Sequence, residues 1–132
     1  MRCLIFLFFL ILLFTIGCKE KNSIKTNNNV SISAEQLYDM KQRGEKLKII
    51  DVRSKKEYFG DMGHIEGSEL IPLQTIASSI NSLKELDQKI YAVCLSGKRS
   101  SIAAKILRDN GIKALNIKGG MMAWNQLKQK NK

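Results

Sequence analysis

Short apolar runs alternate along this chain with segments in which apolar residues recur every three or four positions. The runs cover residues 47–52, 68–72, 90–93 and 113–117. Their compact, often β-branched character predicts strands that are buried in a parallel sheet. A longer apolar block, residues 1–17, stands apart from this alternation.

Capping residues and apolar spacing predict the helices. Ser33 and Gln36 form a capping box for a helix that ends at Gly44, and Ser54 with Glu57 caps a second, short helix. One helical face, interpreted as core, is marked by Ile76, Ile80, Leu83 and Leu86, and a further helix by Ile102, Ala103, Ile106 and Leu107, which recur at helical spacing. A closing helix runs from Gly119-Gly120 through Leu127; its Trp124 is interpreted as a core anchor, and lining a ligand site is the alternative.

Strands that alternate with helices need crossover connections, and these place helices on the faces of the sheet. The sequence therefore predicts one α/β domain with a mainly parallel sheet and helices on both faces. No internal repeat and no second domain is visible.

One cysteine lies where a predicted strand meets a predicted helix. Cys94 follows strand 90–93, and Ser100 is expected to cap the helix that runs to Gly111. The intervening loop would turn backbone N–H groups toward the Cys94 sulfur, with Gly97 supplying an unusual dihedral angle. This ring, the helix N-terminus and the nearby cations favour a thiolate. The alternative is an inert buried cysteine.

The segment Cys94-Leu-Ser-Gly-Lys-Arg99-Ser resembles the active-site loop of the rhodanese sulfurtransferases, in which four residues separate a cysteine from an arginine. Other segments agree with that family in order: Asp51-Val-Arg53 with Glu57, Gly63-His-Ile-Glu-Gly67-Ser68, Ile71-Pro72-Leu73, and Gly119-Gly120-Met-Met-Ala123-Trp124. The resemblance extends over roughly residues 31–128 and implies a single rhodanese-like domain.

The resemblance implies that Cys94 takes sulfane sulfur from a small anionic donor such as thiosulfate and passes it to a thiol or cyanide-like acceptor. We expect the amides of residues 95–99, including Leu95 and Ser96, to stabilise the thiolate and the persulfide. Arg99 and Ser100 are expected to hold the loop closed, and Lys98 to attract the donor. Many relatives carry a polar or basic residue where this chain has Leu95, which suggests a partly apolar mouth.

Four further polar residues are expected to support the site structurally. Asp51, Arg53 and Glu57 are interpreted as a cluster that fixes a strand end, although a catalytic acid role for Asp51 is the alternative. His64 is the only histidine and could form a Cys–His nucleophile pair, but a histidine within Gly63–Gly67 is interpreted as a turn residue.

Other functions remain open at this stage. Phosphatases and arsenate reductases of similar fold also use cysteine and arginine, but five residues separate the two there, which gives a wider ring for a tetrahedral oxyanion. A non-catalytic rhodanese-like binding module usually lacks the cysteine. A relay that passes sulfur to a partner protein shares the chemistry of the transferase.

The apolar block at the start of the chain resembles a bacterial lipoprotein signal. Its apolar stretch, Cys3–Gly17, would span about 22 Å as a helix, which is short of a ~30 Å hydrocarbon core. We therefore expect residues 1–17 to be a signal peptide, Cys18 to be lipidated and residues 18–30 to be a flexible tether. The domain, residues 31–128, would lie on the periplasmic or extracytoplasmic side of the cell envelope, and residues 129–132 would be a basic tail. An uncleaved anchor and plain secretion are the alternatives.

Composition limits the remaining possibilities. The formal net charge is +10, but the lysines are scattered, so nucleic-acid binding is not expected, whereas attraction to anionic headgroups or small dianions is. Of three cysteines, Cys3 would leave with the signal and Cys18 would be acylated, so that Cys94 is the only free thiol and no internal disulfide forms. No metal-ligand pattern is present and no cofactor is expected. The domain is expected to be a monomer.

Overall fold

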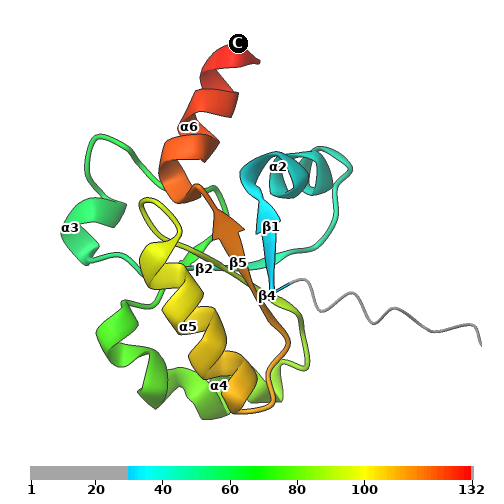
Figure 1. Cartoon of the computed structure of the whole chain (residues 1–132), viewed down its shortest axis with the longest axis vertical. Coiled ribbons are helices and arrows are strands. Elements are labelled where there is room, and N and C mark those ends of the chain that lie inside the picture. Colours follow the sequence, from blue (N-terminus) through cyan, green and yellow to red (C-terminus); the bar gives the residue numbers. More distant parts are fainter. Residues whose placement is uncertain (1–29, 132) are drawn as a thin grey trace, which may run out of the picture.

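The computed structural model describes residues 30–131 (Figure 1). Its five strands are β1 (Ser31–Ser33), β2 (Lys48–Asp51), β3 (Glu69–Leu70), β4 (Ile90–Val93) and β5 (Ala114–Lys118). They form one sheet in the order β1-β5-β4-β2-β3, and every neighbouring pair is parallel. The predicted parallel α/β architecture is confirmed. The predicted signal peptide, Cys18 and the predicted tether through Asn29 lie outside the described residues.

The helices follow the strands in alternation. They are α2 (Ala34–Gln42), α3 (Lys55–Tyr58), the 3₁₀ helix η1 (Leu73–Ser79), α4 (Ile80–Glu85), α5 (Lys98–Asp109) and α6 (Gly120–Lys130). Both predicted capping boxes are present. The side chains of Ser33 and Ser54 accept the backbone N–H groups of Gln36 and Glu57, and the side chains of Gln36 and Glu57 accept the backbone N–H groups of Ser33 and Ser54.

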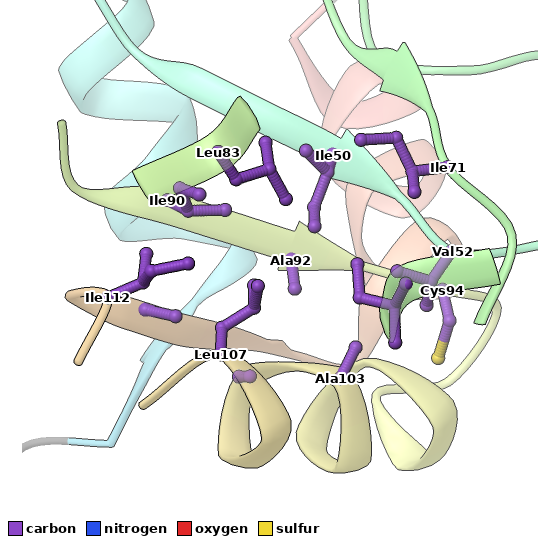
Figure 2. Packing of buried hydrophobic residues seen from close by; sticks show 13 residues of the cluster. Ile50, Val52, Ile71, Leu83, Ile90, Ala92, Cys94, Ala103, Leu107 and Ile112 are labelled. Atoms are coloured by element: carbon purple, nitrogen blue, oxygen red, sulfur yellow. The ribbon is translucent and has the colours of Figure 1, made fainter. Parts of the chain in front are cut away.

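Helices cover both faces of the sheet, with α2 and α6 on one side and α4 and α5 on the other (Figure 1). Successive side chains of a strand point to opposite faces. Accordingly, Ile49 and Tyr91 belong to the core beneath α2 and α6, whereas Ile50 and Ala92 belong to the core beneath α4 and α5. This explains why β4 is buried at every position. Figure 2 shows the core beneath α4 and α5, with Cys94 at one end beside Val52.

Several sequence predictions were wrong in detail. Leu86 was expected in the core, but it is 41% exposed. β1 was not predicted, because three residues are too few to show a period. The segment around Ile76 forms a 3₁₀ helix before α4, and α6 continues to Lys130, so that part of the expected tail is helical.

The described part of the chain was also searched for two further features. None of its helices has the length and apolar character that crossing a bilayer requires. Within residues 30–131, no group of histidine, cysteine, aspartate and glutamate side chains is arranged to bind a metal ion.

The topology collects the chemically important residues at one edge of the sheet. Because all strands are parallel, their carboxyl ends share this edge, where open α/β sheets place ligands. Cys94 directly follows β4, and Asp51 ends the adjacent β2. Val52 donates its backbone N–H to Val93 O at 2.9 Å, which holds the two strand ends together.

Candidate active site

Cys94 lies at the bottom of a tight loop between β4 and α5, and only 1% of its surface is exposed. The backbone N–H of Gly97 donates to Cys94 Sγ at 3.1 Å, and Ser100 Oγ lies 3.3 Å from the same sulfur. Because a thiolate accepts hydrogen bonds far better than a thiol, donors directed at the sulfur favour its ionised form.

The pKa of the Cys94 thiol is lowered from its ordinary value by the balance of two influences. Burial is the largest and raises the pKa, since it disfavours the charged form. Hydrogen bonds oppose it, first from the Ser100 side chain and then from the backbone amides of Ser100, Gly97 and Ser96. Together these donors outweigh burial, so the loop favours ionisation of the Cys94 thiol.

Glycine at position 97 is required by the shape of this loop. Gly97 has φ +97° and is the N-cap of α5, a position at which the sequence had pointed to Ser100. A Cβ atom there would lie 3.2 Å from Ile117 O and 3.3 Å from Gly119 N, besides being strained by the left-handed backbone. The helix therefore begins three residues earlier than predicted, and Ser100 sits in its first turn.

Ser100 does not cap the helix because its side chain is used in the site. It is fully buried, and its Oγ lies 2.7 Å from Asn116 Oδ1 as well as beside Cys94 Sγ. Asn116 is on β5 and is 8% exposed. Sequence reasoning missed Asn116. The available signal was a polar residue between the apolar Leu115 and Ile117 of a predicted strand.

The start of α6 supports the loop from outside. Met121 N–H donates to Cys94 O at 2.8 Å, and Met122 N–H donates to Leu95 O at 3.1 Å. The loop carbonyls are thus turned toward α6, while the following amides are free to face the sulfur. This close approach needs glycine at position 120, where a Cβ would lie 2.3 Å from Cys94 O.

Arg99 connects the loop to α3. Its guanidinium makes two hydrogen bonds to the Glu57 carboxylate, at 2.9 Å and 2.5 Å. These bonds, together with those from Ser54, lower the pKa of Glu57 to about 2, although burial acts in the opposite direction. The same pairing raises the pKa of Arg99 above its ordinary value. Arg99 therefore remains cationic near Cys94.

Asp51 and Arg53 form a separate, buried ion pair. Arg53 Nη2 donates to Asp51 Oδ2 and to Gly63 O, both at 2.7 Å, and both side chains are within 1% of full burial. The three residues Asp51, Arg53 and Glu57 therefore do not form one cluster. Asp51 pairs with Arg53, whereas Glu57 pairs with Arg99 and also bonds Ser54. Both oxygens of the Asp51 carboxylate accept hydrogen bonds from Arg53, so this carboxylate is not directed at Cys94 as a catalytic acid would be.

His64 contacts α3 rather than Cys94. Its ring stacks on Tyr58 with 3.9 Å between centroids, and Nδ1 lies 3.2 Å from Tyr58 O. Trp124 is 5% exposed and packs edge-on against Tyr38 in the core beneath α2 and α6. Neither residue has a hydrogen bond to the loop among those found in the described chain.

An open cavity with a mixed apolar and charged lining lies beside the cysteine loop. Leu95 is partly exposed and lines, with Met62, Glu57 and Arg53, an open cavity of about 260 Å³. Lys98 is exposed at the start of α5. A small anion approaching Cys94 would meet this lysine, Arg99 and the positive end of α5.

Comparison with known proteins places this geometry in a family. Residues 33–127 match the family of rhodanese-like domains. YrkF of Bacillus subtilis, provisionally named a sulfur carrier protein, is 36% identical over 106 residues, which is 80% of this chain and 56% of YrkF. YtwF of the same organism, provisionally named a sulfurtransferase, is 35% identical over 101 residues, which is 76% of this chain and 95% of YtwF.

Solved structures agree with these sequence matches. The crystal structure of a rhodanese-like domain protein from Staphylococcus aureus is similar with a TM-score of 0.65 and 37% identity, over 71% of this chain and 89% of that one. The chain spans little more than half the length of YrkF but nearly all of YtwF. On the strength of its matched residues, its parallel sheet and its cysteine loop, the chain belongs to the family of rhodanese-like domains.

Proposed function

We propose that this protein is a sulfurtransferase that carries sulfane sulfur on Cys94. The observation that supports the proposal best is the buried Cys94 sulfur with donors from Gly97 and Ser100 directed at it, in a loop where four residues separate the cysteine from Arg99. Four intervening residues, rather than the five of the phosphatases and arsenate reductases, favour sulfur over a tetrahedral oxyanion. The provisional names of YrkF and YtwF, a sulfur carrier and a sulfurtransferase, agree with this chemistry.

The reaction runs in two displacements. The Cys94 thiolate attacks the outer sulfur of a donor such as thiosulfate; a sulfur–sulfur bond to Cys94 forms, the donor's own sulfur–sulfur bond breaks, and sulfite leaves with the electron pair. A thiolate or cyanide acceptor then attacks the outer sulfur of the persulfide. The Cys94 thiolate is released and can react again, so no net electrons are exchanged with the protein.

The protein contributes charge stabilisation and access. The donors that lower the pKa of Cys94 also face the negative charge of the persulfide, while Lys98 and Arg99 attract the dianionic donor. The partly apolar mouth at Leu95 and Met62 suits an acceptor with an apolar portion, such as a thiol presented by a partner protein. In that case the domain acts as a sulfur relay, which uses the same persulfide.

The test is mass analysis of the full-length protein after treatment with thiosulfate. We expect one additional sulfur atom on the peptide that contains Cys94, and loss of this sulfur on adding cyanide or a thiol, at a rate proportional to acceptor concentration. Cys94→Ser should gain no sulfur and should have no sulfurtransferase activity, because a hydroxyl is not ionised at neutral pH. Sulfur transfer by that variant, or faster hydrolysis of an aryl phosphate than consumption of thiosulfate by the wild type, would overturn the proposal.

We also propose that the protein works as a monomer held to a membrane of the bacterial cell envelope through a lipid on Cys18. Support comes from the apolar block of residues 1–17, with its short length and its Gly17-Cys18 junction. The domain would then act on the extracytoplasmic side, where its positive charge attracts both anionic lipid headgroups and small anionic donors.

A further inference from the structure

The Ser100 hydroxyl has one proton and two acceptors. Its oxygen lies 3.3 Å from Cys94 Sγ and 2.7 Å from Asn116 Oδ1. A serine hydroxyl donates only one hydrogen bond at a time. Ser100, Cys94 and Asn116 are 0%, 1% and 8% exposed, so water contributes little to settling this competition.

We propose that Asn116 is a positioning residue which determines, through Ser100, whether the site favours the thiol or the thiolate of Cys94. The assignment rests on the sulfur-transfer function proposed above, since it concerns the nucleophile of that reaction. Asn116 does not touch the reacting sulfur itself; its contact is with Ser100.

Two arrangements of the three residues satisfy their hydrogen bonds. In the first, the Cys94 S–H donates to Ser100 Oγ, and the Ser100 O–H donates to Asn116 Oδ1. In the second, the Cys94 proton has left to solvent, the Ser100 O–H donates to the thiolate, and the Asn116 amide has turned so that Nδ2–H donates to Ser100 Oγ. The Ser100 proton stays on Ser100 throughout and only changes its direction.

Asparagine suits this position because its two terminal atoms are similar in shape but opposite in hydrogen bonding. The register of the sheet places Asn116 opposite Ala92 on β4, two residues before Cys94, and this fixes the backbone from which the amide turns. Among the residues that the structure describes, Ser100 is the only hydrogen-bond partner of the Asn116 side chain. Turning the amide therefore breaks no other hydrogen bond of this side chain in that part of the chain.

The thiolate is needed twice in every reaction cycle, when Cys94 attacks the donor and when the acceptor releases it. The second arrangement supports it at both points, since a polarised Ser100 hydroxyl is then directed at the sulfur. An ionised aspartate at position 116 could accept a hydrogen bond from Ser100 but could not donate one. The Ser100 O–H would then stay directed at the aspartate, and the thiolate would lose its side-chain donor.

The experiment measures the rate of Cys94 alkylation by iodoacetamide against pH in the full-length protein, followed on the Cys94 peptide by mass spectrometry. We expect Asn116→Asp to raise the midpoint by about one pH unit or more. In a Ser100→Ala background, the same change should move the midpoint by less than about half as much, because the connecting hydroxyl is gone. An equal shift in both backgrounds would indicate simple charge repulsion and overturn the proposal.

Asn110→Asp is the matched control. Asn110 lies beyond the far end of α5, where its side chain donates to Ile106 O, so the same chemical change should leave the midpoint unchanged. The charged groups on the elements around Cys94 include the Arg99–Glu57 and Arg53–Asp51 pairs, Lys98 and Lys118, and farther along the same elements Lys48, Lys55, Lys56, Lys105, Arg108, Asp109, Lys128 and Lys130. None of them is altered in these variants.

A second measurement needs no substitution at position 116. The side-chain NH₂ signals of Asn116 in a nitrogen–proton NMR spectrum should shift with the same midpoint as Cys94 alkylation, and this shift should disappear in Ser100→Ala. Signals that do not follow the Cys94 titration would overturn the proposal. Both readouts concern the free thiol, so they hold even if thiosulfate fails to load Cys94; that failure would count against the proposed function alone.

Discussion

Two ion pairs of the domain differ greatly in burial, and the loss of each should therefore have a different cost. Asp51 and Arg53 are almost completely buried, whereas the side chains of Lys105 and Asp109 are 69% and 58% exposed. A buried carboxylate that loses its partner retains the full cost of its desolvation, but an exposed one is solvated again by water.

Arg53→Met should accordingly lower the free energy of unfolding by about 3–5 kcal/mol, measured by urea denaturation. The matched change Lys105→Met should alter it by less than about 1 kcal/mol. Adding Asp51→Leu to Arg53→Met should restore more than half of the loss, since no unpaired charge remains. If the double variant is no more stable than Arg53→Met, the buried charge is not the cause.

Glu57 makes a prediction about acid stability. Its pKa of about 2 lies below the ordinary value of 4.5, so its carboxylate stabilises the folded state above about pH 4.5, and this contribution is lost as the pH falls toward 2. Its side chain is 34% exposed, and solvent screening limits the effect to about 1 kcal/mol.

Glu57→Gln should therefore be about 1 kcal/mol less stable than the wild type at pH 7 and nearly as stable at pH 2. Urea denaturation at a series of pH values measures the difference. A gap that persists unchanged at pH 2 would show that packing or the capping bond to Ser54, and not the charge, is responsible.

At the scale of single residues, the sequence indicated Cys94 and its loop because all their features are local. The contacts that the sequence did not reveal join distant residues. Arg99 meets Glu57 across 42 positions, and Ser100 meets Asn116 across 16. Such pairs exist only after the sheet has formed. The Ser100 N-cap was a reasonable expectation from propensity, but Ser100 serves the site and Gly97 caps the helix instead.

At the scale of elements, the contact between α6 and the cysteine loop can be tested by its glycine. Gly120→Ala would place a Cβ 2.3 Å from Cys94 O and would add left-handed strain at φ +53°. Gly44→Ala shares the strain, at φ +74°, but has no atom within 4 Å of the added carbon. Comparing the two variants separates the effect of backbone strain from that of the close contact between residue 120 and Cys94 O.

We expect Gly44→Ala to cost about 1 kcal/mol of stability and to leave persulfide formation unchanged. Gly120→Ala should cost at least ~1–3 kcal/mol more and should slow persulfide formation on Cys94, because α6 can no longer hold the loop carbonyls. Thermal or urea unfolding and the thiosulfate mass assay measure the two effects. Equal effects of both substitutions would show that the close approach is unimportant.

The predicted elements agree with the structure where a long apolar period or a capping box defines them. They differ where tertiary contacts decide. β1 is formed by three residues that pair with β5, and neither its length nor its sequence marks it as a strand. Leu86 lies beyond the end of α4, where the chain turns into solvent, so the helical spacing that included it did not place it in the core.

At the scale of the whole molecule, the proposed lipid on Cys18 predicts where the protein is found. In a bacterial host, Cys18→Ala should release the domain from membranes or block its processing, whereas Cys3→Ala should have no effect because that residue leaves with the signal. Membrane fractionation and mass analysis of the N-terminus measure both. Equal membrane retention of Cys18→Ala with residues 1–17 still present would indicate an uncleaved anchor.

The parallel sheet also gives the domain a direction. The chain enters the fold at the amino end of β1, and every strand then runs toward the same edge, where Cys94 lies (Figure 1). Entry point and thiol are therefore on opposite edges of the sheet. A tether that joins the domain at the amino end of β1 would therefore leave the edge that carries Cys94 unobstructed, open to donors and acceptors from the surrounding water.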